Sequence, residues 1–308
     1  MRPAFSVILL TTLCGAGQGL FVAVFAVEGN LPFRKTAFAL SALLAAGGLV
    51  ASFFHLGRIR PAWRAASQWR TSWLSREVIA LPAFIAGAAL CFLFPGHLAL
   101  ETAVLAVCVA LFLCTAMIYA CLKFLQEWAT PLTVANFFAL PSRKKFATPL
   151  TVANFFLLGS ASGFTLAAAL AAVMAPELAR FYAQWAIALT LLGAAVRVAS
   201  LVRNGRLKPR STLQSAIGIA EPRIRQVSQG YTAGSFNTHE FFHGAGASSL
   251  RWVRWGFLVL AFALPVILLG LSFFGAAFAF QYAGLLMERW YFFAQANHPQ
   301  NLYYQRVS

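Results

Sequence analysis

The sequence has little charge. Only 10% of its 308 residues are charged, whereas 60% are hydrophobic, and its mean hydropathy is +0.72. A soluble domain carries roughly 25% charged residues, so this composition excludes an ordinary soluble protein. We expect most of the protein surface to face the lipid bilayer.

Acidic residues are especially scarce, with 8 Asp and Glu against 24 Lys and Arg. In a soluble protein this excess of positive charge would suggest a nucleic-acid partner. In a membrane protein it collects in cytoplasmic loops and fixes the orientation of the chain. We therefore expect no nucleic-acid partner.

The usual metal-binding patterns are also missing. The five cysteines lie in apolar stretches without CxxC spacing, and none of the five histidines lies in the middle of an expected membrane helix. Iron–sulfur and zinc sites need clustered ligands, and a membrane haem needs axial ligands that face one another within the helices. We expect no haem or metal in this chain.

Apolar runs long enough to cross a bilayer, about 20 residues each, predict an all-α integral membrane protein. We expect a bundle of about eight transmembrane helices in one domain, residues 1–308. The first helix is expected to be retained, because it is too long for a signal peptide. The predicted helices are residues 5–27, 37–54, 78–95, 102–122, 150–174, 181–202, 255–272 and 275–296.

The last two predicted helices come from one long uncharged run, Trp255–Met287. This run is too long for one ordinary span and too short for two, unless the second helix continues to about Ala296. We therefore expect a break near Ser272–Gly275, which leaves Glu288 and Arg289 within the final helix.

Lysine and arginine gather in the loops after the second, fourth and sixth predicted helices, whereas the opposite loops hold only Arg34, Lys35 and Arg180. The positive-inside rule then places both termini and the long loop 203–254 in the cytoplasm. The basic loop residues are Arg58, Arg60, Arg64, Arg70, Arg76, Lys123, Arg143, Lys144, Lys145, Arg203, Arg206, Lys208, Arg210, Arg223, Arg225, Arg251 and Arg254.

One segment is duplicated: ATPLTVANFF occurs at residues 129–138 and again at 147–156. Two copies are too few for a solenoid, so we interpret them as a tandem duplication that lengthens the fourth loop. The first copy is expected to form a short helix on the membrane surface. The second is expected to enter the fifth membrane helix.

The second loop is the densest group of chemically useful residues. His55 ends one predicted helix and Glu77 begins the next, so both are expected at the cytoplasmic mouth of a helix pair. A quinone site needs such a place, because its tail partitions into lipid while its ring needs a hydrogen-bond donor and a proton-exchanging group near water. The competing interpretation is an interfacial histidine among snorkelling arginines and belt tryptophans. Tyr119, near the same end of the fourth helix, is either a donor to a quinone oxygen or a belt residue.

Three charged residues fall inside predicted membrane helices: Arg197, Glu288 and Arg289. Charges at this depth need partners or water. We expect Glu288 to pair with Arg197 or to line a proton path to the quinone, and not to be neutralised simply by its sequence neighbour Arg289. A structural pair or a snorkelling arginine is the alternative.

Two other function classes compete with the quinone hypothesis. Residues 239–243 read HEFFH, which fits the HExxH pattern of zinc proteases, but they lie in a polar loop with no third ligand apparent. A secondary transporter would show related halves with broken helices at matching positions, and only Pro82 and Pro265 are scattered kink candidates. We expect the HEFFH loop to order itself against a partner subunit.

Six motifs, in order along the chain, together resemble the DmsC family of membrane anchors. The resemblance implies a bacterial inner-membrane protein that anchors a molybdopterin catalytic subunit and a ferredoxin-like iron–sulfur subunit on one face. The motifs are MRPAFSVILLTT at the start, HLG at 55–57, SWLSREV at 72–78, TAMIYA at 115–120, NTHEFFHG at 237–244 and ERWYFF at 288–293.

The resemblance also implies a quinone site. In DMSO reductase anchors, the histidine of the HLG motif and a glutamate at the head of the next helix are associated with quinol binding, which selects His55, Gly57 and Glu77 here. The segment RIRPAWRAA departs from the family in its arginine register. We assign Arg76, beside Glu77, to the site.

Orientation distinguishes the subfamilies. The DMSO reductase anchor presents its histidine to the periplasm, whereas the arginines after His55 place this loop in the cytoplasm. That arrangement is similar to the SoeC anchor of cytoplasmic sulfite dehydrogenase. It implies that electrons from sulfite pass to ubiquinone or menaquinone, and the alternative is an anchor that oxidises quinol for a terminal reductase.

Overall fold

The computed structural model describes residues 1–56, 60–122, 124–129, 149–208, 212–225, 227 and 242–298. In these ranges the chain is helical and contains no strand. The long helices are α1 (Phe5–Ala26), α2 (Leu31–Phe53), α3 (Trp73–Leu93), α4 (Leu98–Ala120), α6 (Leu150–Met174), α7 (Pro176–Gly205), α10 (Ala247–Leu258) continued by η2 (Val259–Ala263) and α11 (Leu264–Gly270), and α12 (Phe274–Ala294). Two short helices, η1 (Ala62–Ala66) and α8 (Leu213–Ile217), lie in loops.

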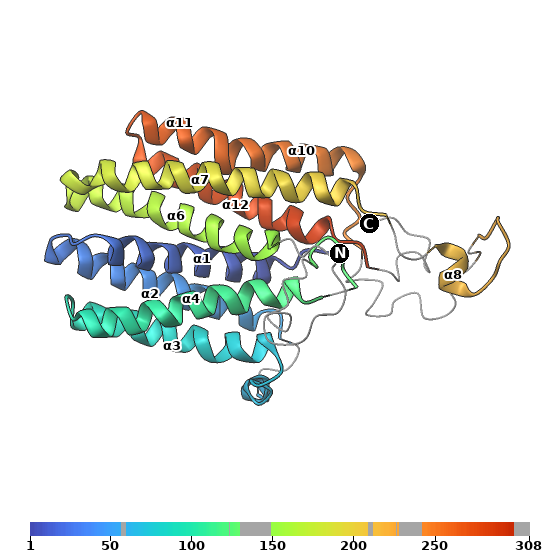
Figure 1. Ribbon diagram of the computed structural model, residues 1–308, viewed down its shortest axis with the longest axis horizontal. Coiled ribbons are helices and arrows are strands. Elements are labelled where there is room, and N and C mark those ends of the chain that lie inside the picture. Colours follow the sequence, from blue (N-terminus) through green and yellow to red (C-terminus); the bar gives the residue numbers. More distant parts are fainter. Residues whose placement is uncertain are drawn as a thin grey trace, which may run out of the picture.

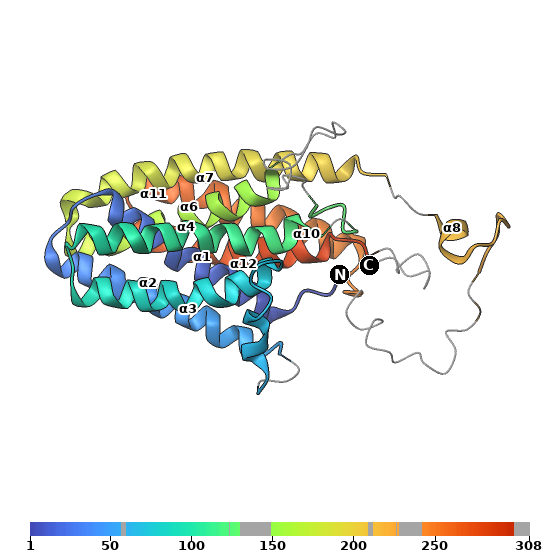
Figure 2. The ribbon, with the colours of Figure 1, turned by 60° about the horizontal axis from the view of Figure 1, so that its bottom comes forward.

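The long helices run side by side in a bundle (Figure 1). The amino terminus lies at the same end as the end of α12, because the Met1 ammonium donates a 2.6 Å hydrogen bond to the carbonyl of Ala296. The loop that carries η1 and the connection through α8 extend from this end too (Figure 2). We call it the terminal end and the other the distal end.

The prediction of an all-helical membrane bundle is confirmed. In the described ranges, seven helices are long and apolar enough to cross a membrane, with α10, η2 and α11 counted as one. The eighth, α12, contains Glu288 and Arg289 and packs against α6, α1 and the α10–α11 helix. The predicted break between the last two helices is found at residues 271–273, where Ser272 has a φ of 65°.

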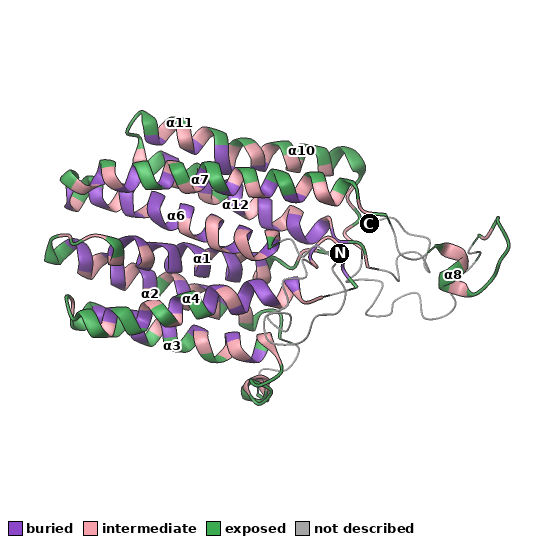
Figure 3. Cartoon of the chain, in the orientation of Figure 1, coloured by how far each residue is buried: buried purple, intermediate pink, exposed green. Residues whose placement is uncertain are grey.

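Helix α1 lies at the centre of the bundle. In its central apolar stretch 72% of the residues are buried, compared with 28% in α3 and in α7, and Figure 3 shows the contrast. It crosses α6 at Gly15 and Gly19, which face Gly159 and Gly163. Small residues spaced by four let membrane helices approach this closely.

Several helices begin earlier than the sequence predicts. Helix α2 begins at Leu31, because Asn30 accepts a 2.9 Å hydrogen bond from the Phe33 amide and Pro32 suits the first turn. It therefore takes Arg34 into the bundle, where Arg34 forms a buried ion pair with Glu101 at 2.5 Å. The interpretation of Arg34 as a loop residue is wrong.

Helices α3, α7 and α10 also extend past the predicted spans, by taking in polar residues at their ends. The second copy of the duplicated segment enters α6 at Leu150, as predicted. The first copy, apart from Ala129, lies outside the described residues.

Candidate functional site

An apolar groove lies on the bundle surface between α1 and α2. Its volume is about 480 Å³, and Ser6 is its polar lining residue. The groove extends to Phe54, directly before His55, and Phe54 is 82% exposed. The lining residues are Phe5, Ser6, Leu9, Leu13, Gly47, Val50, Ala51 and Phe54.

His55 directly follows Phe54, the lining residue at the terminal end of this groove, and lies just after α2. The helix ends at Phe53, and the His55 amide donates a 3.4 Å hydrogen bond to the Ser52 carbonyl. The side chain is exposed, but neighbouring atoms displace part of the water around its ring, which lowers the pKa of His55. Gly57, the other predicted residue of this motif, lies outside the described residues.

Arg76 is held by its own loop. Its Nε and Nη2 each donate a 2.8 Å hydrogen bond, to the carbonyls of Trp69 and Arg70, and its guanidinium lies 4.3 Å from the ring centre of Trp73. These contacts fold the basic loop back onto the start of α3. Arg76 therefore orders the loop and the start of α3.

Glu77 lies deeper than the sequence predicts. Helix α3 begins at Trp73, because the Ser72 hydroxyl accepts a hydrogen bond from the Ser75 amide. Glu77 is therefore inside the helix and only 8% exposed. Its carboxylate accepts a short hydrogen bond from the Thr115 hydroxyl on α4. The prediction that Glu77 begins the helix at the interface is wrong.

In the described part of the chain, no hydrogen bond or ion pair joins His55 to Glu77. The histidine follows the groove residue Phe54, and the glutamate contacts α4. Helices α2 and α3 are nevertheless packed against each other. The two predicted site residues thus lie at neighbouring helices but do not interact through a hydrogen bond or an ion pair.

Tyr119 is enclosed by aromatic rings at the terminal end of α4. Its ring stacks on Phe155 at 5.5 Å and packs edge-on against Trp128, Phe292 and Phe293. It lines neither the groove nor the interior cavity described next. This environment favours a structural role.

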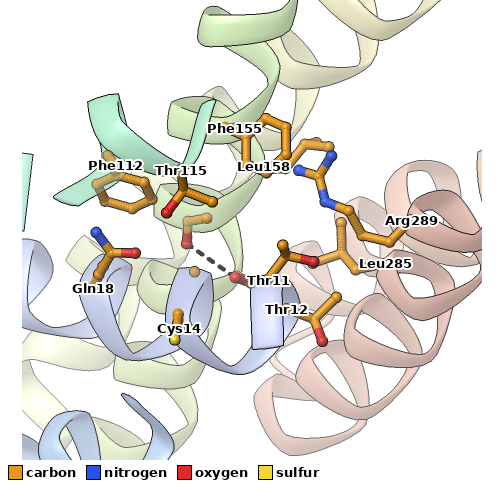
Figure 4. Close-up of a pocket in the computed structure, with 13 residues that line it drawn as sticks. Thr11, Thr12, Cys14, Gln18, Phe112, Thr115, Phe155, Leu158, Leu285 and Arg289 are labelled. Carbon is orange, nitrogen blue, oxygen red and sulfur yellow. Dashed lines mark hydrogen bonds between the residues drawn. The ribbon is translucent and has the colours of Figure 1, made fainter. Parts of the chain in front are cut away.

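A second, smaller cavity lies inside the bundle where α1, α4, α6 and α12 meet (Figure 4). Its volume of about 20 Å³ is enough for a single water molecule, which needs about 10–15 Å³ by the same measure. Polar side chains from all four helices line it: Thr11, Thr12, Gln18, Thr115, Ser162 and Arg289.

The charged residues in the membrane meet next to this cavity. The prediction that Glu288 pairs with Arg197 is confirmed, with Arg197 Nε 2.7 Å from Glu288 Oε1. Arg289 also reaches Glu288, at a longer distance of 3.5 Å, so Glu288 is shared between two arginines and is not neutralised by its sequence neighbour alone. The guanidinium of Arg289 lies 3.9 Å from the ring centre of Phe155 on α6. We call Arg197, Glu288 and Arg289 the charged triad.

The HEFFH segment is only partly described, since His239 and Glu240 lie outside the described residues. His243 and the residues after it up to Gly246 are not helical, and the His243 ring accepts a 2.9 Å hydrogen bond from the Ala245 amide. Within the described ranges, no three His, Cys, Asp or Glu side chains come together as a metal site. The zinc-protease alternative gains no support from these residues.

Sequence reasoning missed three features of this interior. It did not identify Thr115 as the partner of Glu77, Glu101 as the partner of Arg34, or the glycine crossing of α1 and α6. The crossing had a signal, because Gly15 and Gly19, and likewise Gly159 and Gly163, repeat the GxxxG spacing. The Glu77–Thr115 and Arg34–Glu101 contacts join segments that are far apart in the sequence, so no local sequence pattern predicts them.

Two comparisons with known proteins show what the chain is similar to. The family described as DMSO reductase anchor subunit (DmsC) matches residues 3–141, a range that includes His55, Glu77 and Thr115. A sulfite dehydrogenase subunit of Allochromatium vinosum is 50% identical over an alignment of 343 residues that covers 100% of both chains. No solved structure gives a significant match.

Proposed function

The chain belongs to the DmsC family of DMSO reductase anchor subunits, and from this premise we propose that it passes electrons from sulfite oxidation to the quinone pool. It is a membrane anchor subunit of a complex of the sulfite dehydrogenase or DMSO reductase type. Oxidation of sulfite to sulfate releases two electrons and two protons, and reduction of a quinone to a quinol takes up two of each. Quinone is the substrate of this subunit, and either ubiquinone or menaquinone fits the chemistry.

The groove beside His55 is the observation that carries the proposal. An apolar channel of about 480 Å³ that is open to lipid suits a quinone tail. The exposed imidazole at its end can donate a hydrogen bond to a quinone oxygen. Desolvation lowers the pKa of His55, which favours the neutral ring, and the N–H of a neutral ring donates a hydrogen bond without bringing a positive charge to the site.

Glu77 supplies the second part of the chemistry. It is a buried carboxyl on α3, which packs against the groove helix α2, and its Thr115 hydrogen bond holds it in place. We propose that it exchanges a proton with the quinone site, that Arg76 orders the loop next to the site, and that Gly57 belongs to the site as part of the motif of His55. We propose the Arg197–Glu288 pair as the inner end of the proton path.

The partners would dock at the terminal end. Of the described basic residues, Arg60, Arg64, Arg70, Arg203 and Arg206 lie at that end, whereas the distal end holds Lys35, Arg180 and Arg34, and Arg34 is paired with Glu101. This asymmetry supports a cytoplasmic terminal end in a bacterial inner membrane. We propose that a ferredoxin-like iron–sulfur subunit binds there and connects the anchor to a molybdopterin catalytic subunit. Their clusters and molybdopterin carry electrons to the quinone site.

The experiment measures sulfite-dependent quinone reduction by the purified complex. His55→Ala and Glu77→Gln should each lower quinone turnover at least tenfold, while sulfite oxidation with an artificial acceptor is retained because it bypasses the anchor. His97→Ala and Glu177→Gln are matched controls, since both residues lie at the distal end. Normal quinone turnover in both site variants would rule out this site. Quinol oxidation without sulfite oxidation would support the DMSO-reductase-type alternative.

A further inference from the structure

The charged triad encloses a net positive charge. Arg197 and Glu288 are 1% and 0% exposed, and Arg289 is 4% exposed. With two guanidinium groups and one carboxylate, the triad carries a charge of +1. A net charge enclosed in a membrane bundle is costly unless a counter-charge lies nearby.

Glu77 is the acid that can supply this counter-charge. The described part of the chain buries three acids, Glu77, Glu101 and Glu288. Glu101 is already paired with Arg34 at the distal end, and Glu288 belongs to the triad. An ionised Glu77 would bring the sum of the interior charges at the terminal end to zero.

Thr115 connects Glu77 to the triad. Its hydroxyl donates to the Glu77 carboxylate, and its side chain lines the interior cavity together with Arg289 (Figure 4). The three residues also lie at one depth. With a rise of about 1.5 Å per residue, Glu77 is about 6 Å from the start of α3, and Thr115 and Arg289 are each about 7.5 Å from the ends of α4 and α12.

Among the described residues, the other ionisable groups around Glu77 place no unpaired positive charge inside the bundle. Arg76 is bound to its loop, Arg64 of η1 stacks on Trp63, and the cationic residues of α2 lie at its distal end, with His55 beyond its other end. The groups that interact electrostatically with Glu77 from α1 and α4 are Cys14, Cys114 and Tyr119.

We propose that Arg289 is a positioning residue for proton transfer at Glu77, acting as the counter-charge of its carboxylate across the water-sized cavity. This rests on the proposed function, in which Glu77 gives a proton to the quinone. As electrons arrive from the partner subunit, Glu77 releases one of the two protons that quinone reduction needs. Arg289 stabilises the carboxylate that remains until water returns a proton.

Infrared spectroscopy of the purified complex tests this directly. The C=O band of the protonated Glu77 carboxyl is identified by its loss in Glu77→Gln. Arg289→Met keeps the length of the side chain and leaves the neutral Arg197–Glu288 pair. In this variant the band should persist to a higher pH, because a positive charge on the other side of the cavity favours the ionised acid. Arg289→Lys should restore the pH dependence of the natural protein, an effect that a merely structural role would not produce.

An unchanged pH dependence in Arg289→Met would overturn the proposal. If that variant does not assemble, Arg289→Gln tests the same charge, because it keeps a polar side chain beside the cavity and removes the guanidinium. The band should again persist to higher pH, and an unchanged band would be equally decisive against the proposal. Quinone turnover of Glu77→Gln separates the two ideas: normal turnover refutes the proton role of Glu77, whereas a shifted band in Arg289→Met still establishes the counter-charge.

Discussion

Replacing Gly163 with alanine should force the two central helices apart. A Cβ at this position would lie 1.9 Å from the Gly19 carbonyl carbon and 2.1 Å from the Leu20 amide nitrogen. Carbon atoms in contact lie about 3.5 Å apart, so α1 and α6 must separate by about 1.5 Å. Both contacts are with backbone atoms, so no side-chain rotation can relieve them.

The size of the effect follows from two opposing terms. Overpacking a well-packed core costs typically about 1–3 kcal/mol, and contact with rigid backbone favours the upper limit. The change from glycine to alanine within a helix gains up to about 1 kcal/mol. We expect the free energy of unfolding to fall by about 2 kcal/mol. Quinone turnover should fall as well, because Gly15 and Gly159 at the same crossing line the interior cavity.

The assay is unfolding of the purified complex in mixed detergent micelles, followed by tryptophan fluorescence. Gly275→Ala is the matched control, because it lies in α12 and its added Cβ would meet no atom within 4 Å. The control should be as stable as the natural protein or slightly more stable. If Gly163→Ala unfolds at the same denaturant concentration as that control, the close approach of α1 and α6 is wrong.

Two further predictions concern charge. Glu288→Gln should be more destabilising than Arg197→Met or Arg289→Met in the same unfolding assay, because it leaves two buried guanidinium groups without an acid, and breaking a buried pair costs about 3–5 kcal/mol. Equal losses in the three variants would contradict the one-acid triad. The complex should also lose stability as the pH falls below about 6.5, the ordinary value for histidine: desolvation lowers the pKa of both His55 and His298, so the unfolded chain binds protons more tightly than the folded one in this window. The difference in melting temperature between about pH 7 and about pH 5 should be smaller in His55→Gln and in His298→Gln than in the natural protein. An unchanged difference in both variants would refute the linkage.

The sequence allows the prediction of the bundle because lipid imposes a simple rule. Each crossing segment must be long, apolar and helical, and this rule locates α1, α4 and α6 well. It fails where helices continue into polar residues. Arg34 and Glu77 lie inside helices because Asn30 and Ser72 begin those helices earlier than hydropathy suggests.

The candidate site is predicted less completely. His55 follows from its motif, and the Arg197–Glu288 pair follows from the cost of charge in lipid. The side on which Glu77 lies depends on helix rotation, which hydropathy does not determine. Its partner Thr115 and the polar cavity depend on packing among four helices that are far apart in the sequence.

The glycine-mediated crossing of α1 and α6 also has a consequence for biogenesis. Helix α1 leaves the ribosome before α6, so Gly15 and Gly19 have no glycine partner until α6 has been synthesised, more than 120 residues later. The close crossing of the two helices can therefore form only after α2, α3 and α4 have been made.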